Sequence, residues 1–130
     1  MVIDTSAIIA ILTAEPETKR LAHAIATDSK RMMSSFSLLE AGIMIEARKG
    51  ESGGRELDIL LHRTNIEVIP LTSDQTQLAQ EAWRRFGKGR HPAKLNIGDC
   101  CSYALAKYSG EPLLFKGNDF NQTDITTVEY

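Results

Sequence analysis

The sequence contains few cysteine residues, and the two that it has argue against a disulfide-stabilised fold and against a zinc site. Cys100 and Cys101 are adjacent. Neighbouring residues on a helix point about 100° apart, so we expect no disulfide between this pair. No cysteine or histidine pair has the spacing of a zinc-binding motif. Free thiols fit a reducing compartment, so we expect a cytoplasmic protein.

The chain also lacks a long apolar run and a strong excess of charge of one sign. No stretch is long enough to span a membrane, and Asp4 interrupts the apolar start, which argues against a signal peptide. The formal net charge is -2, whereas passive nucleic-acid binders are usually basic. A nuclease is still allowed, because an acidic metal site lowers the net charge of the protein.

Repeats, linkers and low-complexity tracts are absent as well, and 130 residues suit a single domain with a sizeable core. Apolar runs predict strands near residues 1–3, 32–33, 66–69, 112–115 and 126–128. Helical patterns begin near residues 5, 16, 37, 72 and 97, and a Ser-Gly-Gly turn at 52–54 precedes a further short helix. Strands that alternate with helices imply an α/β fold with a mainly parallel sheet covered on both faces.

Four acidic residues stand where strands and helices are expected to change over: Asp4, Glu40, Asp99 and Asp119. Strand ends of the same polarity lie along one edge of such a sheet, where binding sites form. Two carboxylates ~4 Å apart repel by about 4 kcal/mol at an effective dielectric near 20, so a cluster of four needs protons or a cation. Oxygen ligands suit Mg²⁺ or Mn²⁺. The pattern therefore favours a metal-dependent phosphodiesterase.

Each acid also has a purely structural explanation. Ser37 and Glu40 have the spacing of a capping box, and Asn96 and Asp99 come close to it. Asp4 is placed to cap a helix, and the fourth acid lies in a turn-prone Gly-Asn-Asp stretch. An acid at a helix start stays ionised because the helix dipole stabilises its charge. Capping and metal binding are therefore compatible roles.

Four segments, taken in order, match one known family. They are VIDTSAI (2–8), SLLEA (37–41), LNIGDC (95–100) and LLFKGNDF (113–120). With these segments the chain resembles PIN-domain ribonucleases, and more narrowly the VapC toxins of bacterial type II toxin–antitoxin systems. The resemblance implies a three-layer α/β/α fold with a mainly parallel sheet of about five strands. It also implies a single PIN domain over residues 1–130.

The resemblance implies a role for each acid and a cofactor. Asp4 and Asp99 are the implied main ligands of Mg²⁺, with Mn²⁺ as the alternative ion. Glu40 and Asp119 are their implied partners, through water or a second ion. Thr5 and Ser6 directly follow Asp4 in the sequence. In the resemblance they match polar positions that hold the site together.

The fourth acid is where this sequence departs from the family pattern. Many PIN domains carry a threonine and an acid soon after the fourth strand, and this chain has Phe115 and Gly117 near those places. We assign the fourth position to Asp119, because it precedes Phe120 as in the Asp-Phe pair of the family. Asn118 is the alternative.

The resemblance finally implies an activity and partners. The activity is a Mg-dependent endoribonuclease, in which the four carboxylates hold a metal-activated water. The partners are RNA, a cognate VapB-type antitoxin and a second copy of the chain, paired through helices. The apolar side chains offered for that pairing are Ile43, Met44, Leu57, Leu60 and Leu61. The rival interpretation is a non-catalytic PIN-type RNA-binding or scaffold domain, which would have lost one or more of the acids.

A basic run precedes Asp99 in this otherwise acidic chain. It consists of Arg84, Arg85, Lys88, Arg90, His91 and Lys94. Two interpretations stand side by side: a solvated helix end and loop, or a track for RNA phosphates beside the metal site. We interpret the nearby Trp83 and Phe86 as core or dimer contacts in preference to base-stacking platforms.

Overall fold

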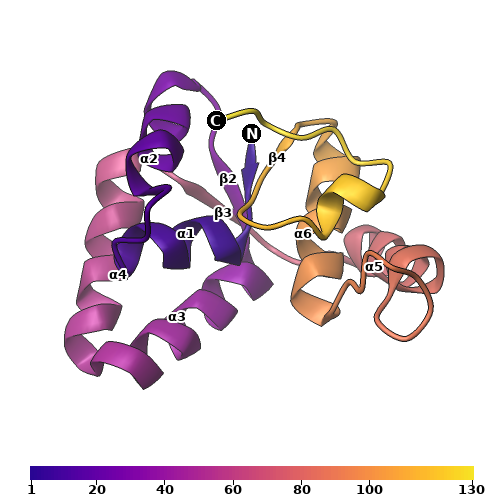
Figure 1. Ribbon diagram of the computed structural model, residues 1–130, viewed down its shortest axis with the longest axis horizontal. Coiled ribbons are helices and arrows are strands. Elements are labelled where there is room, and N and C mark those ends of the chain that lie inside the picture. The colour runs from indigo at the N-terminus through magenta and orange to yellow at the C-terminus, as the bar shows by residue number, and fades with distance from the viewer.

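Strands and helices alternate along the chain in the computed structural model, which describes residues 1–130 (Figure 1). The elements are, in order, β1 (Val2–Ile3), α1 (Thr5–Leu12), α2 (Thr18–Thr27), β2 (Met32–Ser34), α3 (Ser35–Lys49), α4 (Glu51–Thr64), β3 (Glu67–Ile69), α5 (Ser73–Phe86), α6 (Ile97–Ser109), β4 (Leu113–Leu114) and the 3₁₀ turn η1 (Phe120–Gln122).

The four strands form one parallel sheet in the order β3-β2-β1-β4. In the central strand β1, Val2 pairs with Met32 of β2 and with Leu113 of β4. The strand expected at 126–128 is reduced to one parallel bridge between Thr127 and Leu113. The predicted α/β fold with a parallel sheet is therefore confirmed, with four strands and this single outer bridge.

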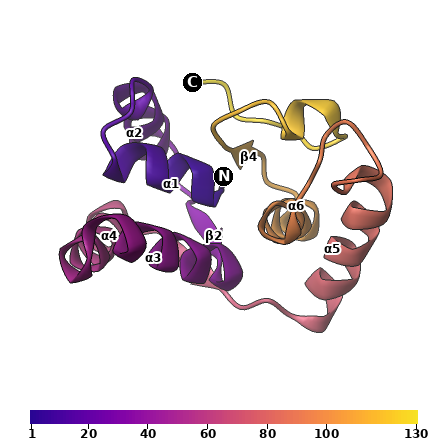
Figure 2. The ribbon, with the colours of Figure 1, turned by 60° about the horizontal axis from the view of Figure 1, so that its bottom comes forward.

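Helices cover both faces of the sheet and make the fold three-layered. Helices α1 to α4 lie on one side, and α5 and α6 lie on the other (Figures 1 and 2). The side chains alternate between these layers: Ile3 and Leu114 pack with α1 to α4, whereas Val2 and Leu113 pack with α5 and α6. Burial on both faces explains why the strands are short continuous apolar runs without polar alternation.

The strand order reverses beside β1, and this reversal positions the candidate site. From β1 the chain moves outward through β2 and β3, and then returns to place β4 on the other side of β1. Ligands bind outside the carboxyl ends of parallel strands at such a switch point. Asp4 follows β1 directly, and Lys116 follows the end of β4 by two residues. The N-terminal parts of α3 and α6 also lie at this edge of the sheet, next to Asp4 and Lys116.

Three local predictions are wrong. The expected turn at 52–54 lies inside α4, because Gly53 lets this helix approach α3: a Cβ there would come within 2.9 Å of the Ile45 carbonyl oxygen. Helix α3 begins at Ser35 because Ser34 caps it, so the capping box of Ser37 and Glu40 does not form. Helix α2 begins at Thr18, two residues beyond the expected start.

Some of the apolar side chains that were candidates for the dimer contact or the core are buried, and others are exposed on the surface. Leu57 is buried in the core, and Met44, Leu60 and Leu61 pack partly against it, whereas Ile43 is 62% exposed. Phe86 belongs to the core, as predicted. Trp83 is 46% exposed, so its interpretation as a core contact is wrong, and its alternative interpretation as a dimer contact stays a prediction. No helix of the chain combines the length and apolar character needed to cross a bilayer.

Candidate active site

Asp4 lies at the carboxyl end of β1 and caps α1. Its Oδ2 accepts hydrogen bonds from the backbone N–H of Ser6 at 3.0 Å and from the Ser6 hydroxyl at 2.7 Å. The same hydroxyl oxygen accepts a hydrogen bond from the backbone N–H of Lys116 at 2.9 Å, which ties the end of β1 to the end of β4. The capping role of Asp4 is confirmed, and its side chain is only 3% exposed.

A buried serine on α6, which the sequence motifs did not identify, supplies the second support of Asp4. Ser102 Oγ donates to Asp4 Oδ1 at 2.5 Å and lies 3.1 Å from Ser37 Oγ. The Ser37 carbonyl oxygen in turn accepts a hydrogen bond from Thr5 Oγ1 at 3.2 Å. These hydroxyls connect α1, α3 and α6 around one carboxylate. The available signal was that Ser102 follows Asp99 by one helical turn and so shares its side of α6.

Asp99 lies in the first turn of α6 and forms a complete capping box with Asn96. Asn96 Oδ1 accepts from the Asp99 backbone N–H at 2.8 Å, and Asp99 Oδ2 accepts from the Asn96 backbone N–H at 3.0 Å. Burial, and after it the negative charges of Asp4, Asp119 and Glu40, raise the pKa of Asp99 to about 7, against the lowering effect of the Asn96 hydrogen bond. The negative charges of Asp4, Glu40 and Asp119 are therefore close enough to Asp99 to affect its pKa.

The raised pKa of Asp99 predicts a pH-dependent stability of the metal-free protein. Because its pKa is raised above the ordinary value of 3.8, the contribution of Asp99 to stability is complete below that value and is lost as the pH rises through about 7. Partial exposure reduces the effect, and we expect the free energy of unfolding to fall by roughly 1–2 kcal/mol from about pH 5 to about pH 8. Urea unfolding in EDTA measures it. The variant Asp99→Asn should lose this decline, and parallel curves for the two proteins would contradict the assignment.

Glu40 reaches the same region from α3, and its position depends on a glycine. Its carboxylate lies so close to Gly98, in the first turn of α6, that a Cβ at Gly98 would come within 2.5 Å of Oε2 and 2.6 Å of Oε1. The true cap of α3 is Ser34, and no hydrogen bond or ion pair from the protein engages the Glu40 carboxylate. Glu40 therefore has no structural task that would occupy its oxygens.

The fourth acid is less closely associated with the others. Asp119 is exposed on the turn after β4 and makes no side-chain cap to η1, although its charge contributes to the raised pKa of Asp99. Neither Asp119 nor the alternative Asn118 lines the hollow that contains the other acids. The choice between these two residues stays a prediction.

A hollow of about 360 Å³ contains the other three acids, Asp4, Glu40 and Asp99. Lys116 supplies the one cationic side chain that lines this hollow, but its ammonium group already forms ion pairs with other residues. Lys116 Nζ forms an ion pair with Glu15 and a second with Glu17 at 3.3 Å. No cationic side chain forms an ion pair with any of the three acids, so their charge is uncompensated within the protein.

The donor chemistry of the hollow fits a hydrated Mg²⁺ ion. No group of three or more His, Cys, Asp or Glu side chains is arranged so that it could hold a metal ion by itself. Mg²⁺ does not require such a cage, because it keeps several of its waters and commonly binds through one or two carboxylates. Asp4 and Asp99 supply hard oxygen donors with fixed orientations, and Glu40 leaves its oxygens free for a metal-bound water.

Comparison with known proteins agrees with this geometry. The family model described as "PIN domain" matches residues 1–125. Ribonuclease VapC30 of Mycobacterium tuberculosis is 56% identical over 98% of this chain and 98% of its own length. Ribonuclease VapC of Mycolicibacterium smegmatis is 57% identical over 98% of this chain and 99% of its own length.

Solved structures support the same fold at low sequence identity. VapC20 of Mycobacterium tuberculosis superposes with a TM-score of 0.80 at 18% identity, over 98% of this chain and 97% of that one. VapBC2 of Rickettsia felis superposes with a TM-score of 0.76 at 18% identity, over 98% of this chain and 96% of that one. Family model, close relatives and fold agree: the chain belongs to the PIN-domain family and, within it, to the VapC ribonucleases.

Proposed function

We propose that this chain is the toxin of a VapBC toxin–antitoxin system and acts as a Mg-dependent endoribonuclease. The observation that carries the proposal is the hollow in which Asp4, Glu40 and Asp99 lie together without a cationic partner. Support for RNA as the substrate comes from relatives that are 56–57% identical over nearly the whole chain and are named ribonucleases. A non-catalytic PIN-type domain has no comparable need to keep these acids together.

The metal ligands in this proposal are Asp4 and Asp99, with Glu40 and Asp119 acting through water or a second ion. When bound by these residues, Mg²⁺ or Mn²⁺ would supply two effects: a lower pKa of its water and neutralisation of charge on the phosphoryl oxygens. The protein residues provide orientation. Ser6 and Ser102 fix both oxygens of Asp4, the Asn96 backbone fixes Asp99, and Glu40 holds and orients the attacking water.

No histidine is needed as the general base. His91 is the histidine nearest in sequence to the acids, and it is already used in the fold. Its Nδ1 accepts a hydrogen bond from the Ala93 backbone N–H at 3.0 Å, and its ring packs edge-on against Phe86 at a centroid distance of 5.2 Å. A water held by carboxylates therefore remains the attacking group in the proposal.

The products of cleavage test this mechanism. Attack by water on the phosphorus atom, in line with the departing 3′ oxygen, leaves a 5′-phosphate and a 3′-hydroxyl. Attack by the ribose 2′-hydroxyl would leave a 2′,3′-cyclic phosphate. We expect only the first pair of ends when total RNA is incubated with the purified chain and Mg²⁺ and the ends are mapped by adaptor ligation with and without phosphatase. Cyclic phosphates as the main product would contradict the mechanism.

We also propose a cognate VapB-type antitoxin and self-association as a homodimer. The antitoxin is supported by two fold neighbours, which are described as a toxin–antitoxin complex from Klebsiella pneumoniae and as VapBC2 bound to promoter DNA. For the homodimer, Leu39 and Ile43 lie one turn apart on α3 and are 60% and 62% exposed. Residues 1–130 would act as one PIN domain. The two unpaired, buried thiols of Cys100 and Cys101 favour a reducing cytoplasm.

A further inference from the structure

A second hollow, of about 800 Å³, lies between α5 and α6 beside the candidate active site. Its lining is mainly apolar and includes Leu71, Leu95 and Ile97. Asn96, the cap of α6, lines both this groove and the acidic hollow. The two hollows therefore lie on either side of the same turn of helix, and a polymer that occupies one can continue into the other.

Trp83 of α5 lines this groove, and its side chain is partly exposed to solvent. It is the only tryptophan of the chain, and 46% of it is exposed. The Arg90 guanidinium lies over its ring, 4.4 Å from the centroid. The neighbouring Gly87 leaves room for the indole, since a Cβ at Gly87 would come within 2.5 Å of Trp83 Cδ1. The indole is thus held in place beside an apolar groove, with Ile97 exposed at the same groove.

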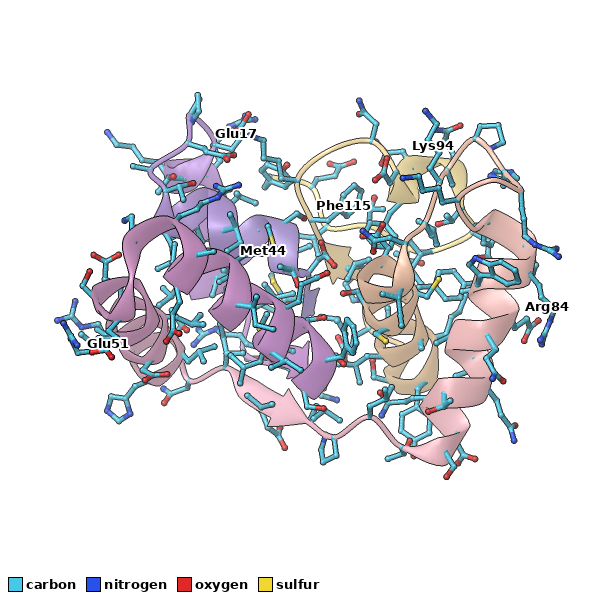
Figure 3. All side chains as sticks on the ribbon, turned by 90° about the horizontal axis from the view of Figure 1, so that it is seen from below. Glu17, Met44, Glu51, Arg84, Lys94 and Phe115 are labelled. Atoms are coloured by element: carbon cyan, nitrogen blue, oxygen red, sulfur yellow. The ribbon has the colours of Figure 1, made fainter.

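The same groove carries unpaired positive charge. Arg84, Lys88 and Arg90 line it, and none of the three forms an ion pair within the protein. Their neighbour Arg85 differs, because it pairs with Asp124 at 3.4 Å. Figure 3 shows Arg84 at the outer edge of α5, Lys94 of the following loop in the same half of the molecule, and Glu51 at the opposite end. This concentration is notable in a chain whose net charge is -2.

The loop that presents Lys88 and Arg90 is anchored at both ends. The Lys88 backbone N–H donates to the Leu95 carbonyl oxygen at 2.9 Å, and the Leu95 N–H donates to the Phe86 carbonyl oxygen at 3.0 Å. Leu95 and Ala93 are completely buried beneath the loop. Cations on a fixed backbone lose less conformational entropy on binding than cations on a mobile one.

We propose that this groove is a substrate subsite in which an unpaired base of the RNA stacks on Trp83 in place of the Arg90 guanidinium, while Arg84, Lys88 and the displaced Arg90 contact the phosphates beside the base. The proposal rests on the ribonuclease function proposed above. Single-stranded RNA is recognised by this combination of aromatic stacking and cationic contacts to phosphate. The acidic hollow repels phosphates until a metal ion binds, so the attraction for RNA has to come from a neighbouring surface, and this groove supplies it.

Trp83 provides its own test, because the intrinsic fluorescence of the protein comes from one indole. A short, dye-labelled single-stranded RNA is titrated in EDTA, and dye anisotropy is recorded in parallel with indole emission. We expect the indole to be quenched with the same midpoint as the anisotropy change. The variant Trp83→Ala should bind about tenfold more weakly, whereas Trp83→Phe, which keeps an aromatic face, should retain most of the affinity. Lys88→Gln should lower the slope of log Kd against log salt concentration by roughly 0.7.

Two matched controls separate this subsite from general effects. Tyr108→Ala removes another exposed aromatic, at the far end of α6, and Arg63→Gln removes an exposed, unpaired cation of α4. Both should bind RNA as the wild type does. Thermal melts of every variant check the fold, and sedimentation checks the oligomeric state. If Trp83→Ala dissociates a dimer and leaves RNA affinity unchanged, the groove joins two copies of the chain and the proposal is wrong.

Cleavage with Mg²⁺ distinguishes failure of the subsite from failure of the proposed function. If the wild type cleaves RNA and Trp83→Ala cleaves it with the same KM and kcat, the subsite is wrong and the ribonuclease function stands. If the wild type cleaves no RNA, the function is wrong and the subsite falls with it. The proposal expects a higher KM for Trp83→Ala with a smaller change in kcat, because the indole binds RNA at a distance from the reacting phosphate.

Discussion

The variant Asp4→Asn is expected to lose RNA cleavage almost completely, with kcat lowered by roughly a thousandfold or more. Asp4 is one of the two proposed direct metal ligands, and an amide carries no charge to hold the cation. The expected loss is measured as single-turnover cleavage of a labelled RNA at saturating Mg²⁺. Asp58→Asn, which removes an exposed acid of α4, is the matched control and should cleave normally.

The fold should survive this substitution for a geometric reason. An asparagine at position 4 can keep its carbonyl oxygen where Oδ2 now accepts from Ser6, and its amide can donate to Ser102, whose hydroxyl can accept as well as donate. Repulsion with Asp99 also falls. We therefore expect the melting temperature without metal to stay the same or to rise. A clear fall for both Asp4→Asn and Asp99→Asn would mean that the two acids are structural caps.

The variant Gly98→Ala should lower cleavage by about a hundredfold, as small displacements of catalytic groups do. The added Cβ would lie 2.5 Å from Glu40 Oε2, so the carboxylate has to leave its present position. Helix α6 itself should not be weakened, because alanine is a better helix former than glycine by about 1 kcal/mol. Activity and helix stability are thus expected to change in opposite directions.

Two further variants decide whether Glu40 is the cause of that loss. Glu40→Gln should reduce cleavage to a similar extent, and adding Gly98→Ala to it should reduce cleavage little further. Gly42→Ala is the control, because a Cβ at Gly42 would meet only Leu57 Cδ2, at 3.9 Å. Full activity of Gly98→Ala, at unchanged stability, would show that the position of the Glu40 carboxylate does not matter for cleavage.

Local features of the site could be predicted from the sequence because they depend on neighbours in the chain. The cap formed by Asp4 and the capping box of Asn96 and Asp99 involve residues two or three apart. The apolar runs around Val2 and Leu113 predicted a parallel sheet buried on both faces. Asp4, Glu40 and Asp99 line one hollow at the edge of that sheet, whereas Asp119 does not. These parts needed no knowledge of tertiary packing beyond general rules of α/β folds.

The remaining features depend on contacts between distant segments. Ser102 supports Asp4 across 98 positions of the chain, and Gly98 makes room for a side chain of α3. Gly98 has no local pattern that marks it, and the spacing of Ser102 from Asp99 places the two on one side of α6 without showing that Ser102 contacts Asp4. Helical periodicity was also insufficient for Trp83, because the adjacent Ala82 faces the core while Trp83 faces the groove. Apolar character identifies candidates for burial, but only packing decides which of them are covered.

The most direct measurement is the cleavage of a labelled RNA by the purified chain across a Mg²⁺ titration that begins in EDTA, at constant ionic strength. The account predicts no cleavage in EDTA and saturable recovery with Mg²⁺ or Mn²⁺ for the wild type. For Asp4→Asn and Asp99→Asn it predicts no recovery at any Mg²⁺ concentration at which these variants remain folded. Full cleavage by the wild type in EDTA, or equal recovery by both variants, would contradict the claim that these carboxylates hold a catalytic metal ion.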